Sequence, residues 1–160
     1  MNAVLKLILQ GEALDASKLA DLLALPQAEI DRQLADLKRD GILLGWRPVI
    51  NPDFESDNSV RAHIEVRVRP EGGLGFDRLA ERIAQFEQVE TCYLMSGAFD
   101  LLVIVKDTNL RKVAAFVHDR LAKLEGVQST ATCFMLRAYK EHGHLITVTR
   151  TGADQPSVSP

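Results

Sequence analysis

The sequence predicts an α+β protein in which a small helical head precedes a larger domain of strands and helices. Three observations predict this class. The first fifty residues repeat apolar side chains at helical spacing three times, with glycine or proline between the repeats. Residues 60–69 alternate strictly between apolar and polar side chains, which is the period of a half-buried strand. Beyond them, the patterns follow in the order helix, strand, strand, helix, strand.

The composition is that of an ordinary globular chain. Of the 160 residues, 46% are hydrophobic and 26% are charged, and the formal net charge is −3. This mild acidity argues against a surface coated with phosphate-binding bases, although it allows one local basic face. The two cysteines, Cys92 and Cys133, are too few for a disulfide scaffold and fit a reducing cytosol. No apolar run reaches the ~18 residues of a transmembrane helix, and the N-terminus has an amphipathic helical pattern rather than that of a signal peptide.

The head is predicted to be a winged helix-turn-helix. Asp15 and Ser17 are suited to cap the second helix, because their side-chain oxygens accept backbone N–H groups. Pro26 suits the first position of the third helix, and Gly41 suits its end. A β-type stretch over residues 42–50 then supplies the wing. The apolar faces of the three helices consist of Val4, Leu5, Ile8 and Leu9; of Leu19, Leu22 and Leu23; and of Ile30, Leu34 and Leu37.

In this layout the third helix enters the major groove of DNA. The alternative is a helical bundle whose charged side chains form a solvated face. Residues 1–52 carry six basic and seven acidic side chains, and this net charge of −1 is unfavourable for a DNA-binding module. The candidate DNA contacts are Gln27 and Arg32 for base edges and Lys38, Arg39 and Arg47 for phosphates.

A polar, proline-containing segment separates the head from the second domain. The predicted organisation is a DNA-binding head at residues 1–50, a linker at 51–59, a sheet domain at 60–140, and a C-terminal extension at 141–160 whose end is disordered.

The order of elements in the second domain predicts a ferredoxin-like βαββαβ fold. Right-handed crossovers fold this order into an antiparallel sheet with both helices on one face. An internal repeat supports it, because residues 82–89 echo residues 120–127 in sequence. The second helix is expected over residues 110–124 and the last strand over residues 130–139. The sheet's other face stays open and invites dimerisation, lined either by the polar or by the apolar side chains of the first strand.

The most distinctive stretch is a hairpin at residues 93–105, in which two apolar runs flank residues 96–100. Gly97 is able to take a positive φ, and Asp100 is able to accept hydrogen bonds from turn amides. The second run, residues 101–105, has no polar residue, which predicts a central strand covered on both faces. The tip of this hairpin, with exposed amides and a carboxylate, is the best candidate for a small-molecule site.

Taken in order, these features resemble the Lrp/AsnC family of transcription regulators over roughly residues 1–140. The passage from Gly41 to Trp46, ending at Asn51 and Pro52, resembles the family's connection from helix to hinge. Residues 97–100 (GAFD) match the family's G-x-[YF]-D turn. Residues 126–132 (GVQSTAT) match its G-V-x-x-T-x-T entry into the last strand.

The resemblance implies a regulator that binds double-stranded DNA and responds to an amino acid or a similar small metabolite. Members of the family dimerise through the sheet domain and often stack into octamers, with the effector between dimers. Turn amides and hydroxyls suit a carboxylate, and a turn aspartate suits an ammonium group. Carried over to this chain, the effector-binding residues are Ser96, Gly97, Ala98, Asp100, Thr130 and Thr132.

The third helix departs from the family pattern. Pro26 stands where the family usually has a serine cap, and Asp31 and Asp36 would face phosphates at a like-charge cost. The sequence therefore leaves open a second reading, an oligomeric small-molecule sensor with weak or lost DNA binding.

Other kinds of chemistry have little support in the sequence. No catalytic set follows from order or spacing, so an enzyme is not expected, although some haem-pathway decarboxylases resemble this family. His142 and His144 have no third ligand near them in sequence, and we expect solvated histidines rather than a metal site. No cofactor is expected. Cys92 and Cys133 fall on opposite edge strands, and we expect buried or half-buried thiols rather than a disulfide or a redox sensor.

Overall fold

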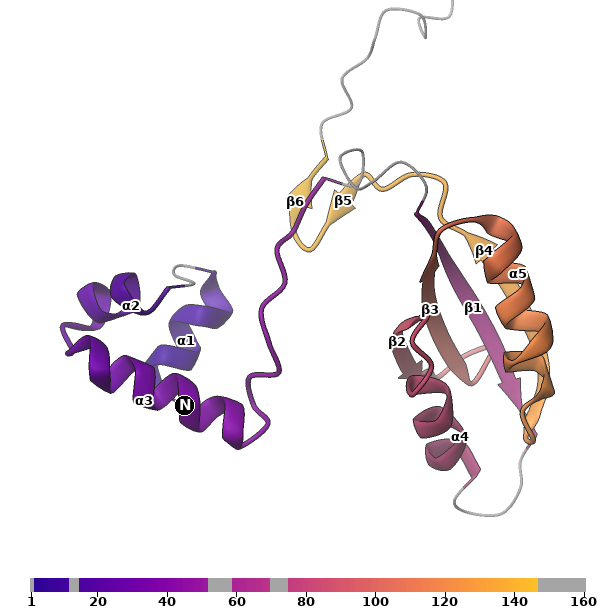
Figure 1. Ribbon diagram of the computed structural model, residues 1–160, viewed down its shortest axis with the longest axis horizontal. Coiled ribbons are helices and arrows are strands. Elements are labelled where there is room, and N and C mark those ends of the chain that lie inside the picture. Colours follow the sequence, from indigo (N-terminus) through magenta and orange to yellow (C-terminus); the bar gives the residue numbers. More distant parts are fainter. Residues whose placement is uncertain (1, 12–14, 52–58, 70–74, 147–160) are drawn as a thin grey trace, which may run out of the picture. The chain divides into compact units, whose positions relative to one another are not determined.

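The computed structural model describes residues 2–11, 15–51, 59–69 and 75–146 (Figure 1). The chain divides into two compact units, Met1–Pro48 and Val49–Pro160. Most of the predicted linker, at residues 52–58, and the end of the predicted tail, at residues 147–160, lie outside the described residues, so the domain boundaries stay a prediction. No helix in the described part of the chain is long and apolar enough to cross a membrane.

The first unit contains the three predicted helices, α1 (Ala3–Gln10), α2 (Ala16–Leu23) and α3 (Gln27–Arg39). Each helix contributes at least one buried residue to a common core, because its apolar side chains recur on one face. The Asp15 side chain caps α2 by accepting a hydrogen bond from the Lys18 backbone N–H at 2.7 Å. Pro26 precedes α3 as its N-cap rather than forming its first residue. The core consists of Val4, Leu19, Ile30 and Leu37.

The β-type stretch predicted over residues 42–50 does not form a strand in the described chain, where residues 43–51 are neither helix nor strand. A strand needs a neighbour that exchanges backbone hydrogen bonds, and apolar alternation alone does not supply one. Pro48 also lacks a backbone donor. Leu43 packs against the core of the head, whereas most apolar side chains that follow it are exposed, with Leu44 93% exposed.

The second unit is the predicted ferredoxin-like domain. Its elements are β1 (Val60–Val68), α4 (Gly75–Ala84), β2 (Val89–Leu94), β3 (Leu101–Asp107), α5 (Leu110–Asp119), a 3₁₀ turn η2 (Leu121–Lys123) and β4 (Val127–Phe134). The strands form one antiparallel sheet in the order β2-β3-β1-β4. The predicted second helix therefore ends at Asp119 and continues only as η2, and the last strand is shifted toward the N-terminus from its expected range.

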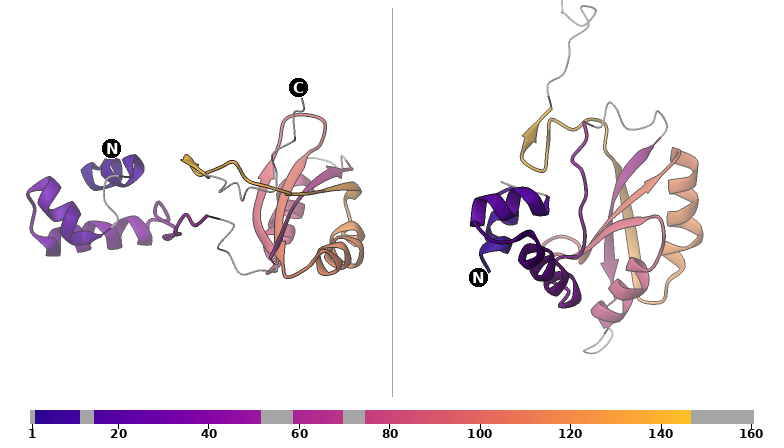
Figure 2. Two further views of the ribbon diagram at one scale, coloured as in Figure 1. Left: turned by 90° about the horizontal axis from the view of Figure 1, so that it is seen from above. Right: turned by 60° about the vertical axis from the view of Figure 1, so that its left-hand side comes forward.

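Helices α4 and α5 pack on the same face of the sheet (Figures 1 and 2). The buried partners Ile64 of β1 and Val103 of β3 face these helices together with Ile83 of α4 and Val113 of α5. Strand β3 is central but alternates between buried and half-buried residues, so the prediction that it is covered on both faces is wrong for this chain. The physical reason is that both crossover helices lie on one side, and no described helix of this unit covers the other.

The uncovered face of the sheet carries the polar side chains of β1. By register, His63 and Glu65 of β1 lie beside the apolar Ile104 and Leu102 of β3. Tyr93 of β2 is paired with Leu102 and is 56% exposed. The open face therefore mixes polar and large apolar side chains.

A short hairpin follows the sheet and consists of β5 (Lys140–Glu141) and β6 (His144–Leu145). Both turn residues, His142 and Gly143, have positive φ values, of 43° and 89°. The hairpin is held to the sheet by an ion pair of 3.4 Å between Arg61 Nη1 and Glu141 Oε1. The two histidines of the sequence motif therefore belong to a tight turn.

Two leucines of α2 test how the head is held together. Leu19 is fully buried and Leu22 is 53% exposed, so Leu19→Ala leaves a cavity and Leu22→Ala does not. We expect Leu19→Ala to cost about 2–5 kcal/mol, enough to unfold so small a unit. The matched control Leu22→Ala should change stability by about 0.5 kcal/mol or less. Amide hydrogen exchange of α1–α3 measures both, and equal protection in the two variants would contradict the assigned core.

Candidate functional site

The solvent face of α3 carries most of the residues predicted to contact DNA. Arg32 and Arg39 are seven residues apart, which is close to two helical turns, so they project from the same side of the helix. Their side chains are 63% and 69% exposed. Gln27 in the first turn and Lys38 in the last turn are also exposed, and Arg47 is exposed in the segment after the helix. The structure thus places four of the five candidates on one helix.

The two arginines of α3 are held by carboxylates of the same helix and its end. Arg32 makes a two-pronged contact with Glu29, at 2.7 Å and 3.0 Å, and its Nη1 lies 3.4 Å from Asp36 Oδ2. Arg39 Nη1 lies 2.7 Å from Asp36 Oδ1, and its Nε lies 3.0 Å from Asp40. We refer to Glu29, Arg32, Asp36, Arg39 and Asp40 as the α3 ion-pair ladder.

Pairing within the ladder shifts the pKa values of Glu29, Arg32 and Arg39. Hydrogen bonds from Arg32 and then Gln33 lower the pKa of Glu29 from 4.5 to about 2. Pairing with Glu29 raises the pKa of Arg32, and pairing with Asp40 raises that of Arg39. The pKa of Glu29 is lower in the folded chain than in the unfolded chain. The ionised carboxylate therefore stabilises the fold fully above the unfolded pKa near 4.5, and this stabilisation is lost as the pH falls toward 2. The ion pair between Glu29 and Arg32 is therefore fully charged at neutral pH.

The sequence analysis missed this ladder, although its signal was present. Glu29, Arg32, Asp36 and Arg39 are separated by three or four residues, the spacing at which side chains on a helix are neighbours. The net charge of the head does not reveal this pairing, because it sums the charges without their spacing.

The predicted effector turn lies between β2 and β3. Ser96, Gly97 and Ala98 are exposed, and a hydrogen bond of 2.8 Å from the Met95 N–H to the Asp100 carbonyl closes the loop. Gly97 does not take a positive φ, in contrast to the prediction, because the loop uses several residues rather than one left-handed residue to reverse direction.

Asp100 ties this turn to β1 rather than to the turn's own amides. Its Oδ2 accepts a hydrogen bond of 2.8 Å from the Val68 backbone N–H, and its own N–H donates to the Val66 carbonyl at 3.0 Å. The last pair between β1 and β3 is Val66 with Leu101, so the carboxylate replaces the strand partner that Val68 would otherwise lack. Asp100 therefore has a structural role, which leaves Oδ1 for any ligand.

The predicted threonines lie on the far side of β1. Thr130 and Thr132 of β4 pair with Val66 and Ile64, so both are on the helix-covered side of the sheet. Val66 pairs with Leu101 on one side and Thr130 on the other, which places Thr130 level with the turn but two strand spacings, about 9–10 Å, away. The structure brings the predicted effector residues to one end of the sheet without enclosing a shared cavity among the described residues.

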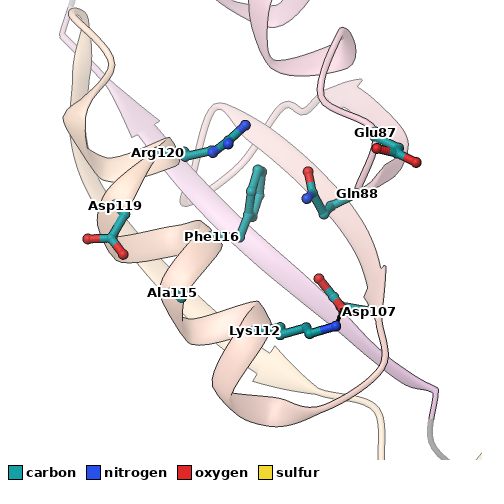
Figure 3. A pocket seen from close by; sticks show the side chains of 8 residues that line it. All are labelled: Glu87, Gln88, Asp107, Lys112, Ala115, Phe116, Asp119 and Arg120. Atoms are coloured by element: carbon teal, nitrogen blue, oxygen red, sulfur yellow. Dashed lines mark ion pairs between the residues drawn. The ribbon is translucent and has the colours of Figure 1, made fainter.

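A hollow lies elsewhere, between α5 and the turn that leads into β2 (Figure 3). Its volume is about 510 Å³, and Phe116 of α5 and Arg120, the residue after that helix, point into it. On its other side the Lys112 ammonium lies 3.9 Å from the Asp107 carboxylate. None of the predicted effector residues lines it. Its walls come from a turn and a helix that are far apart in sequence, so no local sequence pattern predicts this hollow. They are Glu87, Gln88, Asp107, Lys112, Ala115, Phe116, Asp119 and Arg120.

The remaining reactive side chains are not gathered into a site. Cys92 is half-buried and burial raises its pKa, whereas Cys133 is exposed, in contrast to the expectation of a buried or half-buried thiol. Both thiols are free and lie on strands at opposite edges of the sheet. Within the described residues, no group of three or more histidine, cysteine or acidic side chains could hold a metal ion.

A helix-turn-helix unit followed by a ferredoxin-like sheet domain defines a class of transcription regulator. Residues 61–145 match the family model of the Lrp/AsnC ligand binding domain. The uncharacterised HTH-type transcriptional regulator YugG of Bacillus subtilis is 33% identical over 97% of this chain and 92% of its own length. The chain belongs to the Lrp/AsnC family, and it is a transcription regulator rather than an enzyme.

More distant proteins agree with this assignment. The leucine-responsive regulatory protein of Klebsiella pneumoniae is 25% identical over 71% of this chain and 69% of its own length. A transcriptional regulator of Neisseria meningitidis, solved as its L-Met complex, shares the fold with a TM-score of 0.65 at 23% identity, covering 91% of this chain and 93% of its own.

The hydrogen bond from Val68 to Asp100 gives a stability prediction. Asp100→Ala leaves the Val68 N–H without its acceptor at the end of β1, and we expect a loss of about 1–3 kcal/mol from the sheet unit. Asp119→Ala removes an equal charge from an exposed position and should change stability by about 0.5 kcal/mol or less. Urea unfolding measures both, and equal midpoints would show that the hydrogen bond contributes nothing.

Proposed function

We propose that this regulator binds operator DNA through α3 and that its sheet domain assembles the chain and binds an amino acid or a similar small metabolite. The observation that carries the proposal is the helix-turn-helix unit of a chain in the Lrp/AsnC family, with the solvent face of α3 presenting exposed polar and basic side chains. The site of action is the cytoplasm, where the regulator meets its DNA.

The roles of the head residues follow from their chemistry. Gln27 in the first turn of α3 offers an amide that matches adenine, and Arg32 offers a guanidinium that matches guanine. Lys38, Arg39 and Arg47 bind phosphates and fix the register of the helix on the duplex. Two copies of the head then read a palindromic operator.

The open face of the sheet supports a homodimer. Tyr93, Leu102 and Ile104 lie on this face beside polar side chains of β1, and a partner sheet would bury them. The octamer that the family resemblance implies would be built from such dimers.

The proposed effector site is at the end of the sheet that holds the turn at residues 96–100 and, across β1, Thr130 of β4. The exposed amides of Ser96, Gly97 and Ala98 suit a carboxylate, together with the hydroxyls of Thr130 and Thr132. An ammonium group would use Asp100 Oδ1, since Oδ2 is occupied by Val68. The Neisseria relative solved with L-Met supports an amino acid as the ligand class. Such a ligand acts only by binding one assembly better than another, and a neighbouring chain that completes the site would supply this difference.

A second candidate function is a small-molecule sensor with weak or lost DNA binding. The α3 ion-pair ladder favours it, because Arg32 and Arg39 are already paired with carboxylates.

Salt-dependent binding to DNA separates the two candidates. The protein should bind its own upstream promoter duplex more tightly than random duplex, with affinity falling linearly in the logarithm of salt concentration. Lys38→Ala removes one phosphate contact and should reduce the slope by about 0.9, whereas Lys123→Ala, outside the head, should not change it. Fluorescence polarisation measures both. No preference for the promoter, even at low salt with amino acids present, would favour the sensor.

The effector site is tested by calorimetry with single amino acids. Thr132→Val keeps the shape of the side chain but removes the hydroxyl, and we expect at least about a fivefold weaker affinity for the amino acid that binds. Ser129→Ala, an exposed hydroxyl of the same strand, is the matched control and should bind normally. Unchanged binding by Thr132→Val would exclude its hydroxyl from the site.

A further inference from the structure

Three carboxylates lie where a DNA-binding helix is expected to be basic. Glu29, Asp36 and Asp40 pair with Arg32 and Arg39, so the α3 ion-pair ladder contains three negative and two positive side chains. Lys38 and Asp31 belong to the same helix but have no ion pair among the described residues. The function proposed above explains the arginines and leaves the carboxylates without a role.

The carboxylates of the ladder bind the guanidinium groups of Arg32 and Arg39, which are the groups that would contact DNA. Arg32 directs Nε and Nη2, which form one two-pronged edge of the guanidinium, at Glu29, and directs Nη1 at Asp36. This fork is the same group that binds a phosphate or a guanine in two-pronged fashion. Asp36 contributes one oxygen to each arginine and so links the two pairs. An incoming phosphate must displace a carboxylate or lie beside it at a like-charge cost.

The pairs are exposed, which makes them replaceable. The carboxylates of Glu29 and Asp36 are 32% and 36% exposed and the arginines are more exposed still. Exposed ion pairs are weak because water and salt screen them. A single phosphate offers each arginine little more than it already has, whereas a base edge and a phosphate together offer additional hydrogen bonds.

We propose that Glu29 and Asp36 are specificity-determining residues, which suppress binding of α3 to generic DNA by holding Arg32 and Arg39 away from phosphates. This inference rests on the proposed DNA-binding function. Repulsive elements of this kind create specificity by weakening the wrong complex rather than strengthening the right one. The ladder opens where correct base edges replace its ion pairs and stays closed on random sequence.

Near-isosteric amides test the proposal in the full-length protein. Glu29→Gln and Asp36→Asn each weaken the ladder, and Asp31→Asn changes the net charge by the same amount on the same helix without touching it. Each arginine released to a phosphate should steepen the salt slope on random duplex by about 0.9, which is about a three- to fourfold larger loss of affinity between about 50 and 200 mM salt. Binding to random and promoter duplexes is measured by fluorescence polarisation.

The expected result is tighter, more salt-dependent binding of random duplex by Glu29→Gln and Asp36→Asn than by Asp31→Asn, with a smaller preference for the promoter. Random-duplex binding and slopes that match those of Asp31→Asn would overturn the proposal, because charge alone would then explain the effect. Equal affinity of the unchanged protein for both duplexes would instead contradict the operator-binding function. Failure of the specificity proposal is thus seen by comparing variants, and failure of the operator-binding function is seen by comparing duplexes.

Discussion

Both helices of the sheet domain lie on one face, and this one-sided cover decides what every other surface of that domain can do. The alternation of β1 and β3 sorts their side chains into a buried set beneath α4 and α5 and an uncovered set opposite. Because the uncovered set includes Leu102 and Ile104, the sheet domain has apolar side chains on a face that its own described helices do not cover. Assembly is therefore a consequence of how the core is built.

The sequence predicted the features of the fold that depend on local pattern. Strict alternation over residues 60–69 identified β1, and the repeat of residues 82–89 at 120–127 indicated two equivalent halves. It failed where a partner decides the outcome. Residues 42–50 have β-type composition but form no strand in the described chain, and Asp100 bonds to Val68, which is 32 residues away in sequence. No local pattern shows such a partner, because backbone pairing is settled by the assembled sheet.

The candidate sites show the same division. The order of residues placed Ser96–Ala98 on an exposed turn, whereas the strand order β2-β3-β1-β4 sets Thr130 two strands away from that turn. The separation of these groups follows from the strand order and is not visible in the local sequence. On α3 the reverse holds, since the pairing of Arg32 with Glu29 follows from helical spacing and required no tertiary information.

The number of basic residues on a helix consequently predicts DNA affinity poorly unless their ion pairs within the protein are taken into account. Arg32 and Arg39 are exposed, correctly spaced and charged, yet both are engaged by carboxylates. Judged by net charge alone, the carboxylates of this helix disfavour DNA binding. In the proposed competition, a phosphate replaces a carboxylate as the partner of an arginine. This exchange yields little free energy, so phosphate alone is not expected to open the ladder. Discrimination then comes from the additional hydrogen bonds of a matching base edge, the one partner that random sequence does not offer at the right position.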